Sequence, residues 1–352
     1  MSDASNANPE SDSASNNIRK DKVAARILRR WRMLTGGSQT RDADRRTLVA
    51  CSGGADSVAL ALVLSQIPGS CVIAHIRHDI RQESETLADL QHVRHLASRW
   101  GVEFTSRDIR VLNSSGNLEA NARQHRYAAL SELAAEHSCP YIATGHHADD
   151  QLETLLLHLM RGSGLRAMSG MDARSTRDGA VLLRPMLDVT HQELLELLTR
   201  TGTPWREDPT NQDTSLSRNR IRHELIPVMR SIDPLIATHA SQWAEDLSQA
   251  QPIIENQLDL LFQEADRAGQ GFAWSRKQLR EVPDVLLGLI PRKVCESLGE
   301  LRGIDSMTRR AIDSWIRSVK SASTDPTTHR VGPIVSSVDA HRVVVRLAGE
   351  VP

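Results

Sequence analysis

The chain has 352 residues, enough for about two domains, and a hydrophobic content of 39% that can fill real cores. The formal net charge is −1, so the overall composition does not indicate a nucleic-acid-binding protein. The absence of an apolar run of about 18 residues argues against a membrane-spanning helix. The cysteines, Cys51, Cys71, Cys139 and Cys295, lack paired spacing, and we therefore expect a cytoplasmic protein.

Residues 1–18 are rich in Ser, Asn, Asp and Ala and predict a disordered tail. The next segment predicts a basic helix at about 20–33. Between Arg19 and Arg46, ten Lys and Arg residues stand against three Asp residues. This positive charge fits a solvated helix and an RNA-facing helix equally well, so the sequence leaves the choice open.

Strand-like and helix-like segments then alternate along the chain. We predict strands at 47–51, 71–76, 102–105 and 141–144, and helices at 57–66, 86–100, 118–137 and 149–160. The alternation predicts an α/β fold with a doubly wound parallel sheet, in which ligands bind at the carboxyl ends of the strands. We assign residues 19–230 to this catalytic domain, although the pattern loosens after residue 161.

Residues 231–352 predict a smaller domain that is mostly helical. It ends in two short β-like runs, 334–338 and 342–347. The turn residues Asp339-Ala340-His341 separate these runs, which predicts a terminal β-hairpin.

The first predicted strand leads directly into a glycine-rich turn. Its six residues are Ser52, Gly53, Gly54, Ala55, Asp56 and Ser57. Two glycines let the backbone approach an anion closely, and the free N–H groups of the following helix favour negative charge. Asp56 is placed to hold a magnesium ion that bridges phosphates. An ordinary capped turn is the alternative; a Walker-type site is disfavoured because no Lys-Ser or Lys-Thr pair follows.

Polar residues also follow two later strands. His75 and His78 end the second strand and are candidates to contact a nucleotide, although a plain polar loop explains them as well. Gly145 and His146 follow the fourth predicted strand, just before another helix begins. Because the carboxyl ends of parallel strands meet at one edge of a sheet, we expect all these residues to belong to one site.

Three carboxylates begin the helix predicted at 149–160. Asp149, Asp150 and Glu153 share a face because residues three and four apart lie together on a helix. They could bind magnesium or a substrate ammonium group, or simply complement the helix dipole.

Arginines form two further groups. Arg123 and Arg126 share one face of the helix predicted at 118–137 and are candidate phosphate ligands, with a surface pair as the alternative. Arg218, Arg220 and Arg222 are spaced by two, which fits a loop that wraps an anion or a helix start with phosphate contacts. A solvated basic turn is the alternative.

These motifs resemble those of a known family. The hexapeptide 52–57 resembles the pyrophosphate loop of the N-type ATP pyrophosphatases, which cleave ATP between the α and β phosphates and adenylate an oxygen of the substrate. Segments 145–154, 161–166, 184–187, 205–211 and 218–222 resemble, in order, the signature of the tRNA(Ile)-lysidine synthetases. That family uses ATP to activate the wobble cytidine of an isoleucine tRNA with a CAU anticodon. It then joins free L-lysine, which changes codon reading from AUG to AUA.

The resemblance implies roles for individual residues. ATP contacts are implied for Ser52, Gly53, Gly54, Ala55, Asp56, Ser57, His75, His78, Gly145 and His146. Catalytic roles are implied for Asp56, Arg123, Asp149 and Asp150, with Asp56 also serving Mg²⁺. Contacts to lysine or tRNA are implied for Glu153, Arg184, Asp208, Asn211, Arg218 and Arg222, with 231–352 as the tRNA-binding domain. Some members dimerise, which leaves a homodimer open. Arg77 and Ile80 stand where the family has Asn and Leu, so the contacts of the two histidines are not fixed by the resemblance.

Other functions stay open on the residues alone. A tRNA thiolase of the same superfamily would use the same ATP chemistry, but such enzymes need suitably placed cysteines. An RNA-binding module without catalysis would not need the intact 52–57 loop or the three carboxylates. An amidotransferase-type synthetase would need a glutaminase-like segment, and none is visible.

Overall fold

The computed structural model describes residues 18–79, 82–112, 118–162, 164–177, 179–207 and 217–349. The chain divides into two units, Met1–Ser248 and Gln249–Pro352. This division lies later than the predicted boundary after residue 230, inside helix α10 (Ile236–Gln263). The first turns of α10 belong to the first unit because Ala237 packs into its core and the Ser241 hydroxyl donates to the Leu187 carbonyl.

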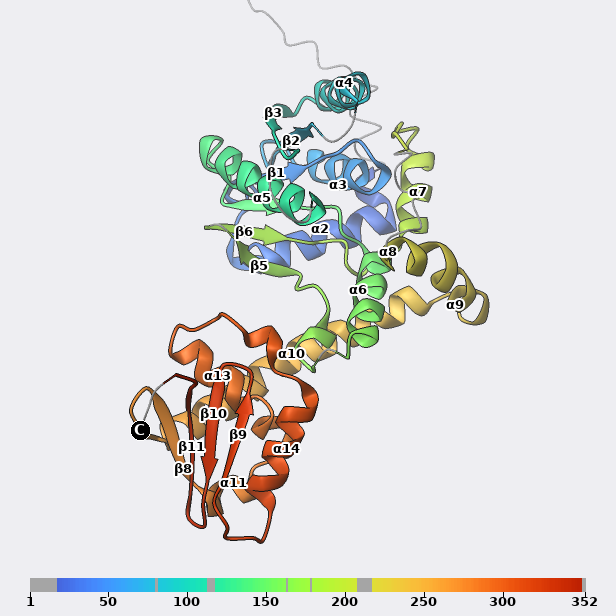
Figure 1. The fold of residues 1–352 in the computed structure, drawn as a ribbon. Coiled ribbons are helices and arrows are strands. Elements are labelled where there is room, and N and C mark those ends of the chain that lie inside the picture. The colour runs from blue at the N-terminus through green and yellow to red at the C-terminus, as the bar shows by residue number, and fades with distance from the viewer. Residues whose placement is uncertain are drawn as a thin grey trace, which may run out of the picture. The chain divides into compact units, whose positions relative to one another are not determined.

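A six-stranded sheet forms the centre of the described part of the first unit (Figure 1). Its strand order is β3 (Glu103–Ile109), β2 (Cys71–His78), β1 (Thr47–Ala50), β4 (Tyr141–Ala143), β6 (Ala180–Leu183) and β5 (Arg174–Arg177). The first five strands are parallel, and β5 runs antiparallel to β6 at the edge. The prediction of a doubly wound parallel sheet is confirmed. Strands β5 and β6 were not predicted, because both are short and β5 carries two arginines.

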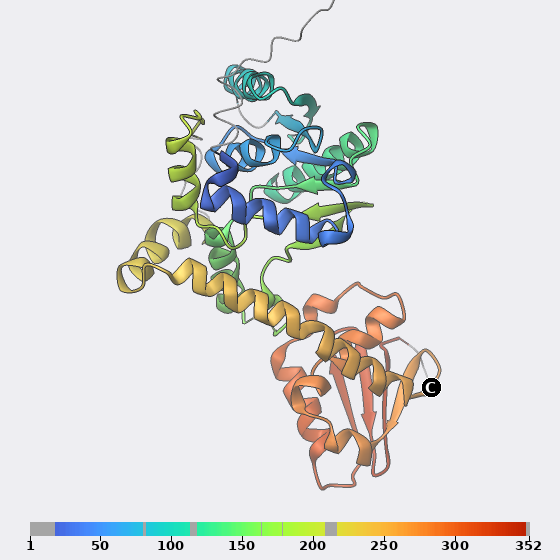
Figure 2. The ribbon, with the colours of Figure 1, turned by 180° about the vertical axis from the view of Figure 1, so that it is seen from behind.

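Helices cover both faces of this sheet, which is why its central strands are apolar along their length (Figures 1 and 2). Val49 and Ile73 point into one core, and their neighbours Leu48 and Val72 point into the other. One core contains residues of α2 (Lys22–Leu34), α3 (Ala55–Ser65), α4 (Glu83–Arg99) and α7 (His191–Arg200). The other contains residues of α5 (Leu118–Glu136). Because β1 pairs with both β2 and β4, its loop lies at the middle of the carboxyl edge.

Several arginines of the basic N-terminal segment form ion pairs and hydrogen bonds within the first unit. Arg26 of α2 contacts Glu193 at 2.7 Å, Arg30 contacts Glu245 at 3.0 Å, and Arg32 contacts Asp42 at 2.5 Å. Buried Arg45 donates to backbone carbonyls of the same segment. These ion pairs favour a structural role for the segment over an RNA-facing one. Residue 18, which the sequence analysis placed in the tail, is helical and packs against the core.

The rest of the first unit lies beside the carboxyl edge of the sheet. Helix α6 (Ala148–Met160) begins just after β4. It packs against a helical run made of α8 (Ser217–Arg220), the π-helical turn η5 (Ile221–Leu225) and α9 (Ile226–Ile232). This run faces the first turn of α6 and thereby contributes to the site described below.

The second unit contains an antiparallel sheet packed against helices. Its described strands have the order β7 (Asp266–Arg267), β8 (Gly271–Ser275), β11 (Arg342–Leu347), β10 (Ile334–Val338) and β9 (Thr327–Val331). Its described α-helices are the C-terminal part of α10, which supplies Leu258 and Leu261 to the core, α11 (Arg276–Glu281), α12 (Asp284–Leu287), α13 (Ile290–Ser297) and α14 (Arg309–Lys320). The predicted hairpin is confirmed as β10–β11, but it belongs to a larger sheet than expected. Strand β9 was not predicted because most of its residues are polar, and strand β8 was not predicted because it begins with a glycine.

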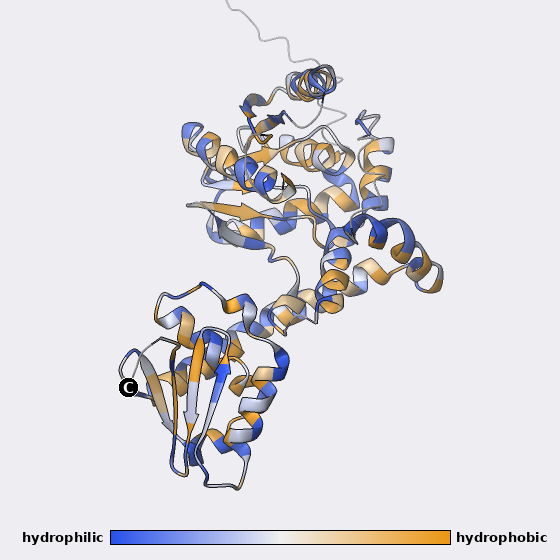
Figure 3. Ribbon diagram, in the orientation of Figure 1, coloured by the Kyte–Doolittle hydropathy of each residue, from blue (hydrophilic) through white to orange (hydrophobic). Residues whose placement is uncertain are grey.

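The ribbon coloured by hydropathy shows that many strand segments are hydrophobic and that many helices alternate between hydrophobic and hydrophilic residues (Figure 3). In the second unit Trp274 and Trp315 are almost completely buried. None of the helices in the described part of the chain has the length and apolar character needed to cross a membrane.

Arg276 holds the second unit together from inside. Its side chain is only 2% exposed. The guanidinium donates to five backbone carbonyls, those of Ser318, Val319, Ser321, Ser323 and Asp339. One cation therefore satisfies acceptors at the end of α14 and in the β10–β11 turn, where the hydrogen bonds of regular structure stop.

Arg276→Met should lower the free energy of unfolding of the second unit by about 3 kcal/mol, because several buried carbonyls lose their donors. Urea unfolding followed by tryptophan fluorescence measures this change. Arg292→Met is the matched control: it removes an exposed pair with Glu296 and should change stability by less than about 0.5 kcal/mol. Equal stability of Arg276→Met and the unmodified protein would contradict the assigned role.

Candidate active site

The glycine-rich loop between β1 and α3 has the backbone geometry of an anion cradle. Gly53 has a φ of 99°, a left-handed conformation that favours glycine. Gly54 is the N-cap of α3 and offers no side chain to the first N–H groups of the helix, so these donors point out of the helix end. The Ser57 hydroxyl accepts from Ser52 N–H at 3.1 Å and donates to Gly54 carbonyl at 2.9 Å, which fixes the turn.

Gly145, directly after β4, packs against this loop. A Cβ atom at Gly145 would lie 3.0 Å from the backbone nitrogen of Ser57. The next residue, His146, hydrogen-bonds through Nδ1 to the Thr144 hydroxyl at 2.8 Å, and burial lowers its pKa to about 3. His146 is therefore neutral at physiological pH. The loops after β1 and β4 are thus in contact, as the sequence predicted.

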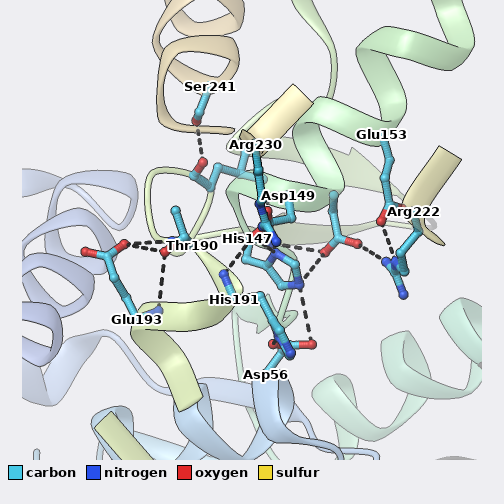
Figure 4. A network of polar contacts seen from close by, with 12 residues as sticks. Asp56, His147, Asp149, Glu153, Thr190, His191, Glu193, Arg222, Arg230 and Ser241 are labelled. Atoms are coloured by element: carbon cyan, nitrogen blue, oxygen red, sulfur yellow. Dashed lines mark hydrogen bonds and ion pairs between the residues drawn. The ribbon is translucent and has the colours of Figure 1, made fainter. Parts of the chain in front are cut away.

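Asp56 lies between two histidines (Figure 4). His191 Nδ1, at the start of α7, donates to Asp56 Oδ1 at 2.7 Å, and His147 Nε2, at the N-cap of α6, lies 3.4 Å from Oδ2. Burial acts to raise the pKa of Asp56, but the two histidines outweigh it and hold the pKa well below its ordinary value. Burial likewise acts to lower the pKa of His147, yet the surrounding carboxylates Asp150, Asp149 and Asp56 raise it well above 6.5. Asp56 is thus ionised beside a histidine that favours its charged form.

The three carboxylates of α6 are held by arginines of the α8–α9 run. Glu153 is 1% exposed; its Oε2 accepts from Arg218 at 2.8 Å and its Oε1 accepts from Arg222. Asp150 Oδ1 accepts from the same two arginines, at 3.3 Å and 3.1 Å. A guanidinium suits such shared, bidentate contacts because its donors form a planar fork.

Asp149 completes this cluster. Its Oδ1 contacts Arg230, and its Oδ2 accepts from the backbone N–H of His191 at 2.7 Å (Figure 4). Burial acts to raise the pKa of Asp149, but the hydrogen bonds from His147 and His191 lower it to about 2. The pKa of Asp150 is also lowered, since nearby His147 and the arginines outweigh its burial. Both groups are therefore negatively charged at neutral pH.

The remaining predicted residues lie around this centre. His75 is buried and donates through Nδ1 to the Cys51 carbonyl at 2.8 Å, so it supports the loop from behind, while His78 is half-buried at the end of β2. Arg123 is exposed and lies over the Tyr127 ring at 5.2 Å. Arg184 is buried and donates to the Asp172 carbonyl at 2.6 Å.

The structure brings together six of the predicted residues in one network: Asp56, Asp149, Asp150, Glu153, Arg218 and Arg222. Asp208 and Asn211 lie outside the described residues. Three further residues of the network, His147, His191 and Arg230, were not among the predicted site residues. A signal for His191 was present, because Thr190 and Glu193 form a capping box that starts α7 at this residue.

The donor atoms limit which metal the site suits. Among the described residues, one group is arranged so that it could hold a metal ion: Asp56, His147 and His191. Mg²⁺ prefers oxygen ligands and usually binds one or two carboxylates together with phosphates and water. Only Asp56 of this group meets that preference, so it fits Mg²⁺ as a single protein ligand beside the anion cradle, and the imidazoles do not.

The cysteines do not form a reactive group. All four are free and buried. Burial raises the pKa of Cys51, the one next to the loop, to about 11 and that of Cys71 to about 12. Their thiols are protonated at neutral pH and are poor nucleophiles and metal ligands.

Comparisons with known proteins agree with this geometry. A family described as the PP-loop domain matches residues 25–229. The chain is 32% identical over 325 residues to the tRNA(Ile)-lysidine synthase of Nostoc sp., covering 87% of this chain and 92% of that protein. The enzyme of the same name from Thermus thermophilus is 38% identical over 220 residues, which are 60% of this chain and 41% of the relative. That from Bordetella pertussis is 36% identical over 243 residues, or 66% and 74%.

A solved structure shares the fold at lower identity. The U34-tRNA thiolase NcsA from Methanococcus maripaludis superposes with a TM-score of 0.51 and 16% identity, covering 64% of this chain and 78% of that one. At this identity the likeness concerns the fold alone.

Gly145→Ala should weaken ATP binding about tenfold, because the new methyl group must push the first turn of α3 away from the cradle. Calorimetric titration with ATP measures the change in Kd. Gly164→Ala is the matched control, since nothing lies within 4 Å of its added Cβ. Unchanged ATP affinity in Gly145→Ala would show that the contact does not shape the cradle.

Proposed function

The chain belongs to the tRNA(Ile)-lysidine synthase family, and from that premise we propose that it joins free L-lysine to the wobble cytidine of a CAU-anticodon isoleucine tRNA. The observation that carries the proposal is the junction between two charged regions. The anion cradle of residues 52–57 is linked to the carboxylates of α6 through Asp56, His191 and Asp149. A site of this kind can hold ATP phosphates on one side and a cationic substrate on the other.

The reaction then has two balanced steps. The 2-keto oxygen of the cytidine attacks the α-phosphorus of ATP, and pyrophosphate leaves toward the N–H groups of the cradle. The neutral lysine amine then attacks carbon 2 of the base, and AMP leaves with the oxygen. Adenylation is needed because the keto oxygen is otherwise a poor leaving group, and the amine must lose a proton to react.

Asp56 is proposed to hold Mg²⁺ together with the phosphates of ATP. When bound there, the ion neutralises phosphate charge and orients the α-phosphorus. The chain's own groups prepare this position, because the depressed pKa keeps Asp56 ionised and the cradle donors face the same space. Arg123 is proposed to assist phosphate binding, since a guanidinium supplies planar donors.

The lysine ammonium is proposed to bind at Asp149, Asp150 and Glu153. In the protein alone these carboxylates are neutralised by Arg218, Arg222 and Arg230, so an incoming ammonium group has to replace a guanidinium. A displaced arginine would then be free to contact the lysine carboxylate or a tRNA phosphate. A buried carboxylate is strongly destabilised without a cation beside it. Exchanging one cation for another therefore costs less free energy than leaving the carboxylate unpaired.

Further assignments follow from the family. We propose that Arg184 and the segment containing Asp208 and Asn211 contribute to binding of lysine or tRNA. The region 231–352 is proposed to bind tRNA, and the protein is proposed to act in the cytoplasm, where its substrates meet. A monomer and a homodimer are distinguished by mass measurement. Each of these assignments is open to direct test by tRNA binding, fractionation and mass measurement.

Incubation with ATP, radiolabelled lysine and CAU-anticodon isoleucine tRNA should transfer the label to the tRNA. Asp56→Asn should reduce this transfer at least a hundredfold, because the amide cannot support the cation as a carboxylate does. Asp44→Asn, an exposed carboxylate paired with Arg41, is the matched control and should leave transfer unchanged. Absence of label on the tRNA with the unmodified protein would contradict the proposed function.

Cys139→Ala should keep full lysine transfer, since its buried thiol has a raised pKa and touches none of the site residues named above. The same assay with a sulfur donor in place of lysine should produce no thiolated tRNA. Loss of activity in this variant, with its fold intact by circular dichroism, would instead favour the thiolase alternative.

A further inference from the structure

His191 contacts two site carboxylates that come from different elements. Its ring donates through Nδ1 to Asp56 of α3 at 2.7 Å. Its backbone N–H donates to Asp149 of α6 at 2.7 Å. One residue at the start of α7 therefore joins the cradle side of the site to the carboxylate side, as Figure 4 shows.

The position of His191 is fixed by the start of its helix. Glu193 accepts from Thr190 N–H at 2.8 Å, and the Thr190 hydroxyl accepts from Glu193 N–H at 3.3 Å. Arg26 of α2 anchors Glu193 at 2.7 Å. The backbone of α7 is thus held by its own cap and by α2, independently of the histidine ring.

The ring itself is not part of a hydrophobic core. The side chain of His191 is 42% exposed, and its ring centroid lies 5.4 Å from that of His147 in a tilted arrangement. Replacing an exposed ring at a capped helix start costs little stability. Since the ring adds little to the packing of the fold, we infer that its close contact with Asp56 serves the site.

We propose that His191 is a positioning residue for Asp56, an inference that rests on the proposed role of this carboxylate in binding ATP with magnesium. A carboxylate can rotate about its last side-chain bond. His191 engages Oδ1 and His147 approaches Oδ2, so the two together fix its plane. Each carboxylate oxygen can accept more than one contact, which leaves both able to face a ligand.

The two contacts of His191 allow its effects on the two halves of the site to be tested separately. Only the ring contact with Asp56 depends on the side chain, whereas the contact with Asp149 comes from the backbone and survives substitution. A side-chain variant should therefore affect ATP and leave lysine unaffected. If the ring had a merely structural role, its loss would weaken the binding of ATP and of lysine together.

Two variants and a control test the proposal. His191→Ala removes the ring donor, and His191→Asn places an amide nitrogen the same number of bonds from Cα as Nδ1. Gln192→Ala is the control on the same helix turn, at an exposed neighbour whose amide donates to Glu196. The readouts are the Kd for ATP in the presence of magnesium, measured by calorimetry, and the KM for lysine in the transfer assay.

His191→Ala should weaken ATP binding about tenfold, the size expected for a lost hydrogen bond to a charged group. His191→Asn should recover most of the affinity, and the KM for lysine should stay within about twofold in all variants. Unchanged ATP affinity in His191→Ala, or an Asn variant as weak as the Ala variant, would overturn the proposal. The calorimetry needs no tRNA, so its pattern stands or falls separately from lysine transfer by the unmodified protein.

Discussion

Neutralisation of buried carboxylates is the constraint on which this site depends. Asp149, Asp150 and Glu153 are buried at the carboxyl edge of the sheet, and half-buried Asp56 lies beside them. The lowered pKa values of Asp56, Asp149 and Asp150 keep these three groups ionised. Such a group is costly to bury unless each member is paired. One partner, His147, is the N-cap of the helix that carries three of the carboxylates. The other partners come from later in the chain: His191, Arg218, Arg222 and Arg230. The placement of α7 and of the α8–α9 run follows from this requirement.

The same pairing explains how the site can serve two substrates. The cradle after β1 offers backbone donors and no cationic side chain of its own, so it is suited to phosphates. The carboxylates of α6 are already occupied by cations of the chain, so they are suited to exchange one cation for another. His191 joins the two regions through separate atoms. A ligase that uses ATP and an amino acid in successive steps needs this kind of adjacency.

Much of the fold could be predicted from the sequence, because strands and helices alternate with clear periods between residues 47 and 160. Strands β5, β6, β8 and β9 could not, since they are short or polar and are stabilised by pairing with neighbours far along the chain. The site residues in the loops after β1 and β4 could be predicted because glycines and carboxylates follow these two strands directly in the sequence. His191 and Arg230 were missed because their roles come from tertiary contacts with Asp56 and Asp149 that no local pattern encodes.

In the proposed reaction, one site cleaves ATP at its α-phosphorus and then transfers lysine. The sharpest test uses ATP labelled at the α-phosphate to follow AMP, and ATP labelled at the γ-phosphate to follow pyrophosphate. Both products are compared with the lysine bound to CAU-anticodon isoleucine tRNA. AMP and pyrophosphate should form in equal amounts, one of each for every lysine joined, and no AMP should accumulate without the tRNA. Formation of ADP and phosphate, or lysine transfer that does not match AMP release, would contradict it.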